Sequence, residues 1–282
     1  MKKKILVGLV GLIFAGTFAM SNNALALNIT AMDSAINLGQ SIVGSGVSIS
    51  NANYTGATGA SGYFTGGIAA GLGFDSGIVL TTGAAANLNG TTNTSGSIST
   101  SNGWSGNSFL TTMAGQKTYD ATTLSFDFIS QSDSVYFNYA FGSDEFNEWV
   151  DDFNDVFAFI FNGVNIATLD DGTAVSINTI NNYDNSSYYN DNEYNGAFKF
   201  EYDGFTDMLT AYATGLTAGD TYSITLAIAD AGDYAYDSGV FLQAGSFGDA
   251  PTSPVPEPST IFLLGFGLLG LASVRRKRHQ EL

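Results

Sequence analysis

The sequence predicts an all-β fold, a single β-sandwich or jelly-roll-like domain with an N-terminal signal helix and a short C-terminal apolar helix. Three observations support this class. Apolar and polar residues alternate at period two in several segments, turns containing glycine or asparagine separate those segments, and no helical period is sustained. Because the chain is 44% hydrophobic and lacks cysteine, its stability must come from a buried core and not from disulfides.

Residues 1–26 are typical of a secretory signal peptide. Lysines at positions 2–4 precede an apolar run over 5–20, and Ala24 and Ala26 fit the small-residue pattern of a cleavage site. A permanent membrane helix is the alternative, but the run is short for a span of roughly 20 residues. We therefore expect export by the general secretion machinery and cleavage by signal peptidase, which leaves a body over 27–250.

The body begins with short strands and continues with stronger ones. β-Branched runs closed by glycine predict strands within 44–54 and 77–83, and the turn-rich stretch over 85–108 is expected to be a long surface loop. In the next strand, Leu124, Phe126 and Phe128 share one face. All the strands expected from this point lie over 122–130, 134–143, 155–169 with a hairpin turn at Asn162-Gly163, 196–205, 221–230 and 238–247.

Charge is unevenly distributed along the chain. Between Leu27 and Pro258 the cations are Lys117 and Lys199, against 25 of the 26 acids, so this span carries 2 − 25 = −23. Such a body repels nucleic acid, and we expect no nucleic-acid partner. The one histidine, His279, lies in the basic tail, which excludes histidine-based triads and zinc sites from the body. A carboxylate pair for glycan hydrolysis remains chemically available.

The acids concentrate in two segments, each of which joins two apolar strands. If the segments meet at one edge of the sandwich, their carboxylates offer the oxygen ligands that Ca²⁺ prefers. The alternative is two separate, solvated acidic loops. We hypothesise one structural Ca²⁺ ion. Its expected ligands are Glu145, Asp155, Asp230 and Asp237, with Asp144 and Asp233 as secondary candidates.

The C-terminal region has three parts in a fixed order. A proline-rich spacer over 251–258 leads into the motif Val255, Pro256, Glu257, Pro258 and Ser259. Residues 259–282 then contain an apolar run over 261–274 and a basic cluster, Arg275, Arg276, Lys277 and Arg278. The cluster is expected to stay cytoplasmic by the positive-inside rule.

This arrangement resembles the PEP-CTERM sorting signal of Gram-negative bacteria. The resemblance implies recognition by exosortase, a transpeptidase-like membrane enzyme, and transient membrane insertion of the C-terminal helix before its removal. It also implies a precursor held in the inner membrane and then delivery to the cell surface or extracellular matrix, in bacteria that make exopolysaccharide and biofilm.

The body over 27–250 is similar to the choice-of-anchor L domain. The segments that carry the resemblance are "GIVLTTG", "FNYAFGSDEFNEWVDDFNDVFAFIFNG", "FEYDGFT" and "LAIADAGDYAYDSGVFLQAGSF". The family implies attachment to a surface anchor and no established catalysis. We therefore expect a non-enzymatic adhesive or glycan-associated protein, with exopolysaccharide or other surface proteins as partners. A carboxylate-dependent extracellular glycan hydrolase is the alternative.

Overall fold

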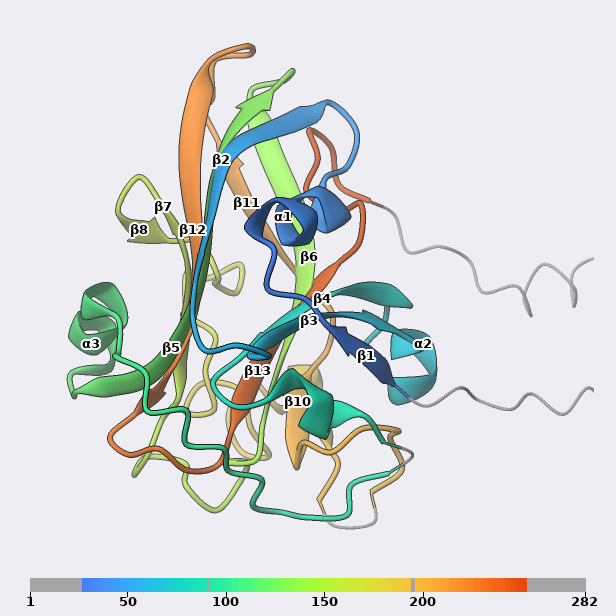
Figure 1. Ribbon diagram of the computed structural model, residues 1–282, viewed down its shortest axis with the longest axis vertical. Coiled ribbons are helices and arrows are strands. Elements are labelled where there is room, and N and C mark those ends of the chain that lie inside the picture. Colours follow the sequence, from blue (N-terminus) through green and yellow to red (C-terminus); the bar gives the residue numbers. More distant parts are fainter. Residues whose placement is uncertain (1–26, 91, 194–195, 253–282) are drawn as a thin grey trace, which may run out of the picture.

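The computed structural model describes residues 27–90, 92–193 and 196–252, which form two antiparallel β-sheets packed as a sandwich (Figure 1). The predicted all-β class is therefore confirmed. The expected signal helix, sorting motif and C-terminal helix lie outside the described residues. Within these three described ranges, no helix is long and apolar enough to cross a membrane.

The larger sheet has eight strands in the order β1-β3-β4-β13-β6-β10-β9, and β11 pairs with β6 beside that path. One end of β6 pairs with β11 and the other end with β10, so β6 lies between β13 and these two short strands. The bounds are β1 (Asn28–Ala31), β3 (Ser61–Thr65), β4 (Ser76–Thr81), β6 (Ser134–Ser143), β9 (Tyr189–Asp191), β10 (Gly204–Thr206), β11 (Leu209–Thr214) and β13 (Ser238–Gln243).

The smaller sheet has five strands in the order β2-β5-β12-β7-β8. Asn162 and Gly163 both have positive φ, 50° and 78°, as a type I′ hairpin between β7 and β8 requires. The bounds are β2 (Val47–Thr55), β5 (Thr118–Ser130), β7 (Val156–Phe161), β8 (Val164–Asn165) and β12 (Thr221–Ala231). The helical turns are short: α1 (Ala35–Ile42), α2 (Gly67–Ala70), α3 (Ser108–Ala114), η1 (Ala85–Leu88) and η2 (Ser186–Tyr188).

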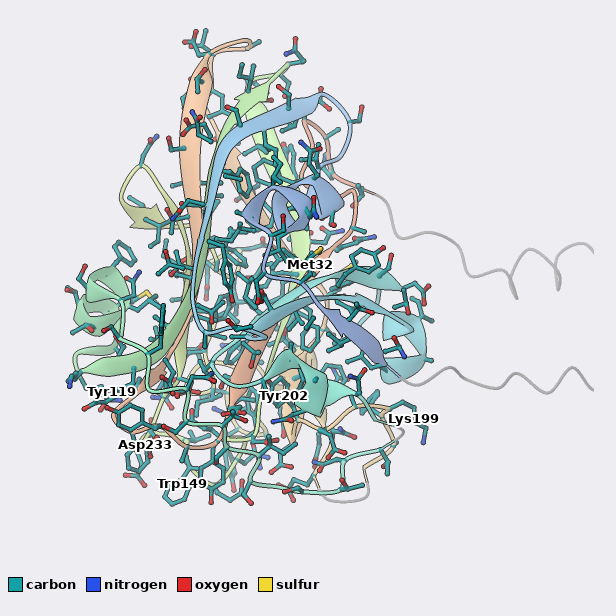
Figure 2. All side chains as sticks on the ribbon, in the orientation of Figure 1. Met32, Tyr119, Trp149, Lys199, Tyr202 and Asp233 are labelled. Atoms are coloured by element: carbon teal, nitrogen blue, oxygen red, sulfur yellow. The ribbon has the colours of Figure 1, made fainter. Side chains whose placement is uncertain are left out.

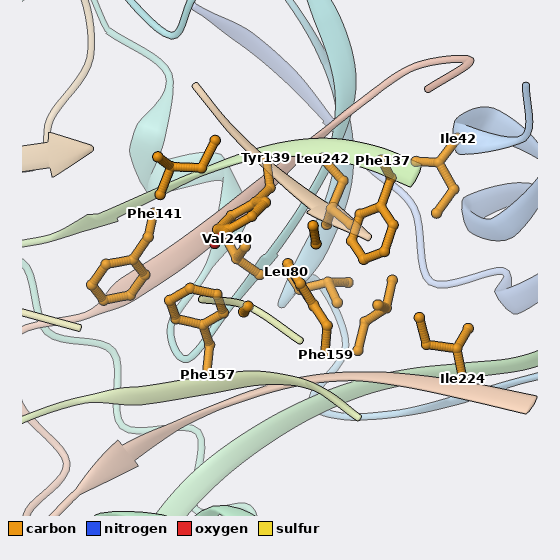
Figure 3. Packing of buried hydrophobic residues seen from close by; sticks show 14 of the residues in the cluster. Ile42, Leu80, Phe137, Tyr139, Phe141, Phe157, Phe159, Ile224, Val240 and Leu242 are labelled. Atoms are coloured by element: carbon orange, nitrogen blue, oxygen red, sulfur yellow. The ribbon is translucent and has the colours of Figure 1, made fainter. Parts of the chain in front are cut away.

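The core lies between the two sheets, where side chains fill the interior (Figure 2). Alternate residues of β6 face β7 across the sandwich, and their aromatic rings interlock (Figure 3). The ring centroids of Phe137 and Phe159 lie 4.8 Å apart, as do those of Phe141 and Phe157. A second cluster covers the outer face of the larger sheet, and α3 covers part of the outer face of the smaller one. This burial explains why β7 is apolar on both faces.

The strand expected over 196–205 is wrong for most of its length, because the extended ladder is confined to β10 (Gly204–Thr206). The alternating aromatic residues Phe200 and Tyr202 are buried, but in the second cluster on the outer face of the larger sheet. Their carbonyl groups accept hydrogen bonds from Nδ2 of Asn192, at 3.0 and 2.9 Å. The side chain of Asn192 thus supplies the hydrogen-bond donors that the backbone of a neighbouring strand would have supplied.

The described chain ends on the outer face of the larger sheet. Asn138 lies on the face of β6 opposite Phe137, and its Nδ2 donates to Oγ1 of Thr252 at 2.9 Å. Upstream, Oγ of Ser132 donates to the carbonyl of Asp249 at 3.1 Å. These contacts fix where the segment leading to the sorting motif leaves the sandwich.

Candidate functional site

The two acidic segments meet at one end of the sandwich. The first connects β6 to β7 and the second connects β12 to β13, so both pass from one sheet to the other. The backbone N–H of Asp144 donates to the carbonyl of Asp237 at 3.2 Å. The N–H of Ala231 donates to Oδ1 of Asp155 at 3.0 Å. Residues distant in sequence are therefore joined directly at this end.

The structure buries five of the six acids considered in the sequence. Asp144, Asp155 and Asp230 are fully buried, and Glu145 and Asp237 are exposed by 1% and 2%. Asp233 differs, because it is only half-buried. Its Oδ1 accepts a hydrogen bond from the N–H of Ala235 at 3.0 Å, so this carboxylate stabilises its own turn. We call the five buried side chains the acid cluster: Asp144, Glu145, Asp155, Asp230 and Asp237.

A strap, residues 98–104, lies against two members of the acid cluster, Asp144 and Asp237, and against Asp120. Every second backbone N–H of this extended segment donates to a buried carboxylate, in the way a strand would donate to a neighbouring strand. The partners are Ile98 with Asp144, Thr100 with Asp237, and both Asn102 and Trp104 with Asp120, at 2.8, 2.8, 2.8 and 2.5 Å. The predicted surface loop is thus bonded on one side to a row of carboxylates.

Four carboxylate oxygens in the cluster are buried without a hydrogen-bond partner. They are Oδ2 of Asp155, both Oδ atoms of Asp230 and Oδ2 of Asp237. The hydroxyl of Thr82 partly offsets the rise in the pKa of Asp230, but no donor reaches bonding distance of either oxygen. Buried polar atoms normally have partners, so these four oxygens call for a physical explanation.

Burial raises the pKa of every member of the cluster. The pKa of Asp144 rises to about 9 and that of Glu145 to about 8, chiefly through desolvation. Burial raises the pKa of Asp237 to about 6. The pKa values of Asp155 and Asp230 rise well above the ordinary range, first because of burial and then because each faces another carboxylate. A net positive charge or bound protons must therefore balance this end of the molecule.

The body offers little cationic charge for this balance, since its only cations are Lys117 and Lys199. The exposed amine of Lys117 lies 4.3 Å from the ring centroid of Tyr119, over its face. In the three described ranges, no group of three or more acidic or histidine side chains is already arranged to hold one metal ion. Of the six expected ligands, then, no three are arranged around one position that a metal ion could occupy.

Sequence reasoning missed Asp120 and Asp203, which are also buried. Asp120 has the same parity in β5 as the inward-facing Leu124, so a charge at this position was a readable signal. Asp203 accepts a 2.5 Å hydrogen bond from Nδ2 of the buried Asn93. Nothing in the local pattern indicated that pairing, because the two residues are 110 positions apart.

The other predicted site residues lie outside the described residues. These are the cleavage alanines Ala24 and Ala26, the motif Val255 to Ser259, and the basic cluster Arg275 to Arg278. The sequence comparison covers part of this region, since a model of the PEP-CTERM protein-sorting motif matches residues 254–277.

The fold and the sorting motif together define an exported β-sandwich protein that exosortase sorts to the cell surface or extracellular space. A family model of the choice-of-anchor L domain matches residues 28–248, which include both sheets and the acid cluster. The chain belongs to the choice-of-anchor L domain family. No curated protein and no solved structure matches it.

Proposed function

We propose that the protein is a non-catalytic binding module displayed outside the cell, adhesive or glycan-associated, whose acid cluster holds a structural Ca²⁺ ion. The observation that carries this proposal is the state of Asp230: the residue is fully buried, and neither of its carboxylate oxygens has a partner. A carboxylate in that state is suited to a cation, and it is out of reach of a polymeric substrate.

Burial argues against the hydrolase alternative. Glycan hydrolysis requires two carboxyl groups that flank the scissile bond and contact the sugar. The members of the acid cluster are at most 2% exposed, and the strap is bonded to two of them, Asp144 and Asp237. Asp155 and Asp230 have no exposed surface, so a glycan chain could contact them only after the surrounding protein had moved. The cluster therefore fits a structural role better than a catalytic one.

The energetic cost of leaving the cluster without a cation favours ion binding. At pH 7, keeping one proton on Asp144, whose pKa rises from 3.8 to about 9, costs about 4 kcal/mol relative to the unfolded chain (3.2 pH units at 1.36 kcal/mol each). A whole domain is stable by only about 5–15 kcal/mol. Two or three such groups would consume most of that stability, so a bound cation is the cheaper way to balance the charge.

Asp155 and Asp230 are the pair that we assign to the ion. Asp155 is the main charged neighbour of Asp230, and the pair holds three of the four unpaired oxygens. The hydroxyl groups of Thr82 and Ser238 lie near them and offer neutral oxygen ligands. Two carboxylates with neutral oxygens give the low ligand charge of extracellular modules, whose Kd values for Ca²⁺ are about 10⁻⁴–10⁻³ M.

The test combines thermal unfolding with an activity assay. We expect Ca²⁺ to raise the midpoint of the full chain over that in EDTA, and we expect Asp155→Asn to lose this response. Asp152→Asn is the matched control, because Asp152 is exposed on the same loop. No reducing sugar should appear from polysaccharide in either condition. A Ca²⁺ response that is equal in Asp155→Asn and wild type would disprove the site, and sugar release would support the hydrolase.

A further inference from the structure

We infer that a groove beside Trp104 binds one residue of a neutral glycan, and that the buried carboxylate of Asp120 holds this groove in shape. The inference deepens the proposed function and rests on it, because it names the ligand class and the surface of the binding module. The observations that carry it are the groove's lining, the fixed backbone around it and the charge of the body.

The groove forms where one neighbour of β5 ends and another begins. Strand β2 pairs with β5 as far as Thr55, opposite Thr123. Beyond that point the strap takes over, since the N–H of Asp120 donates to the carbonyl of Trp104 at 3.0 Å and Ser105 forms a bridge with Tyr119. The gap between strand and strap leaves a cavity of about 210 Å³ on the outer face of the smaller sheet.

The lining of this groove is neutral and suits a polyhydroxylated ligand. Its lining residues are Trp104, three residues with hydroxyl groups (Thr55, Ser105 and Thr123), Asn107, Gly106 and Ala121. Trp104 is 44% exposed, so its ring is accessible to the apolar face of a pyranose. The volume is below the roughly 300 Å³ at which sites for drug-sized ligands begin, which leaves room for one sugar unit of a longer chain.

The charge of the body selects against anionic polymers. The groove has no charged residue in its lining, but it lies in a body with a net charge of −23 between Leu27 and Pro258. A polyuronate or sulfated glycan would meet repulsion from this body at every approach. A neutral chain with equatorial hydroxyl groups has the flat apolar faces that stack on tryptophan and pays no such cost. We therefore assign the groove to neutral glycans of this kind.

The backbone around Trp104 is fixed before any ligand arrives. Asp120 accepts hydrogen bonds from the N–H groups of both Asn102 and Trp104, and it is itself 1% exposed. At Gly106, an added Cβ would lie 2.0 Å from the carbonyl oxygen of Thr118, so the backbone just after the strap passes closer to β5 than any side chain allows. A pre-formed site loses little conformational entropy on binding. Asp120 is thus a positioning residue for the groove, and the strap that it holds is also bonded to the acid cluster at Asp237.

The test uses the fact that the chain contains two tryptophans, Trp104 and Trp149. In full-length Trp149→Phe protein, fluorescence reports on Trp104 alone. We expect cellohexaose to change this emission saturably and an alginate hexamer to leave it unchanged. Calorimetry of Trp104→Ala in the otherwise wild-type chain should show cellohexaose affinity reduced by at least about tenfold. Tyr212→Ala, which alters an exposed aromatic side chain of β11, should bind like wild type.

The outcomes separate the groove from the ion. Trp104→Ala should keep the full Ca²⁺ response of the melting midpoint while it loses cellohexaose binding. The groove assignment is overturned if Trp104→Ala binds cellohexaose as tightly as wild type, if the wild type binds no cellohexaose, or if alginate binds instead. In each of those cases the Ca²⁺ response of the wild type still decides the proposed function on its own.

Discussion

Asp230→Asn tests the acid cluster with two effects of opposite sign. The substitution keeps the shape of the side chain and removes its charge, and it breaks no hydrogen bond, because neither oxygen of Asp230 accepts one. Without a cation, Asp230 must either hold an uncompensated buried charge, which costs about 3–5 kcal/mol, or keep a proton at a comparable cost. The buried, unpaired amide that replaces it costs about 1–3 kcal/mol. In EDTA at pH 8 the variant should therefore be more stable than wild type by about 2 kcal/mol.

Calcium should reverse this order. At about 10 mM, a hundredfold excess over a Kd of about 10⁻⁴ M, the ion stabilises the wild type by about 2.7 kcal/mol. For a body of this size the midpoint then rises by about 5–11 °C. Asp230→Asn should gain nothing.

Scanning calorimetry of both proteins in EDTA and in Ca²⁺ measures all four values, with Asp152→Asn as the exposed control. The reasoning fails if Asp230→Asn is less stable than wild type in EDTA and still responds to Ca²⁺.

Three further predictions concern the cluster, its covering and the processing of the chain. Without metal, the free energy of unfolding should fall by up to about 1.4 kcal/mol per pH unit for each raised group from pH 5 to 8. The reason is that native Asp144, with a pKa of about 9, keeps a proton that the unfolded chain loses above about 3.8. Urea unfolding in EDTA measures this dependence, and a flat pH profile contradicts it. Gly83→Ala would place a Cβ 1.8 Å from Oδ2 of Asp237, so it should lower the free energy of unfolding by about 1–3 kcal/mol and expose the strap to protease. Gly103→Ala has open space around its Cβ and a φ of +64°, so it should lower that free energy by only about 1–2 kcal/mol of backbone strain and leave the strap protected. Intact mass of the surface form should show loss of residues before about Leu27 and after about Pro258, and recovery of the whole apolar tail would argue against exosortase cleavage.

The strands that could be predicted are those whose pattern records the core directly. Leu124, Phe126 and Phe128 alternate in β5 because one face of that strand packs against the other sheet. The strand β11 escaped prediction, because its inward positions Ala211 and Ala213 are too small to give a clear apolar alternation. The strap could not be predicted as a covering element at all. Its partners are carboxylates, and Thr100 bonds to an aspartate 137 residues away.

The candidate site could also be predicted in part from the sequence. Acids that flank apolar strands were recognisable as a group, and the sandwich topology brings both of their segments to one end. Their individual roles depend on donors that the sequence does not place. Asp144 has both oxygens occupied by backbone N–H groups of Ile98 and Asp203, whereas Asp230 has neither occupied. Two aspartates in similar local sequence patterns therefore differ in whether their oxygens are free to bind a ligand.

The attachment of Thr252 to Asn138 places the last described residue of the chain on the side of the sandwich away from the groove. That contact lies on the outer face of the larger sheet, whereas the groove beside Trp104 lies on the outer face of the smaller one. In a copy tethered through the C-terminal segment, that contact would therefore not cover the groove. At high surface density, many copies would bind one long polymer at several points. The low affinity of each single sugar contact would then add up to durable adhesion through avidity.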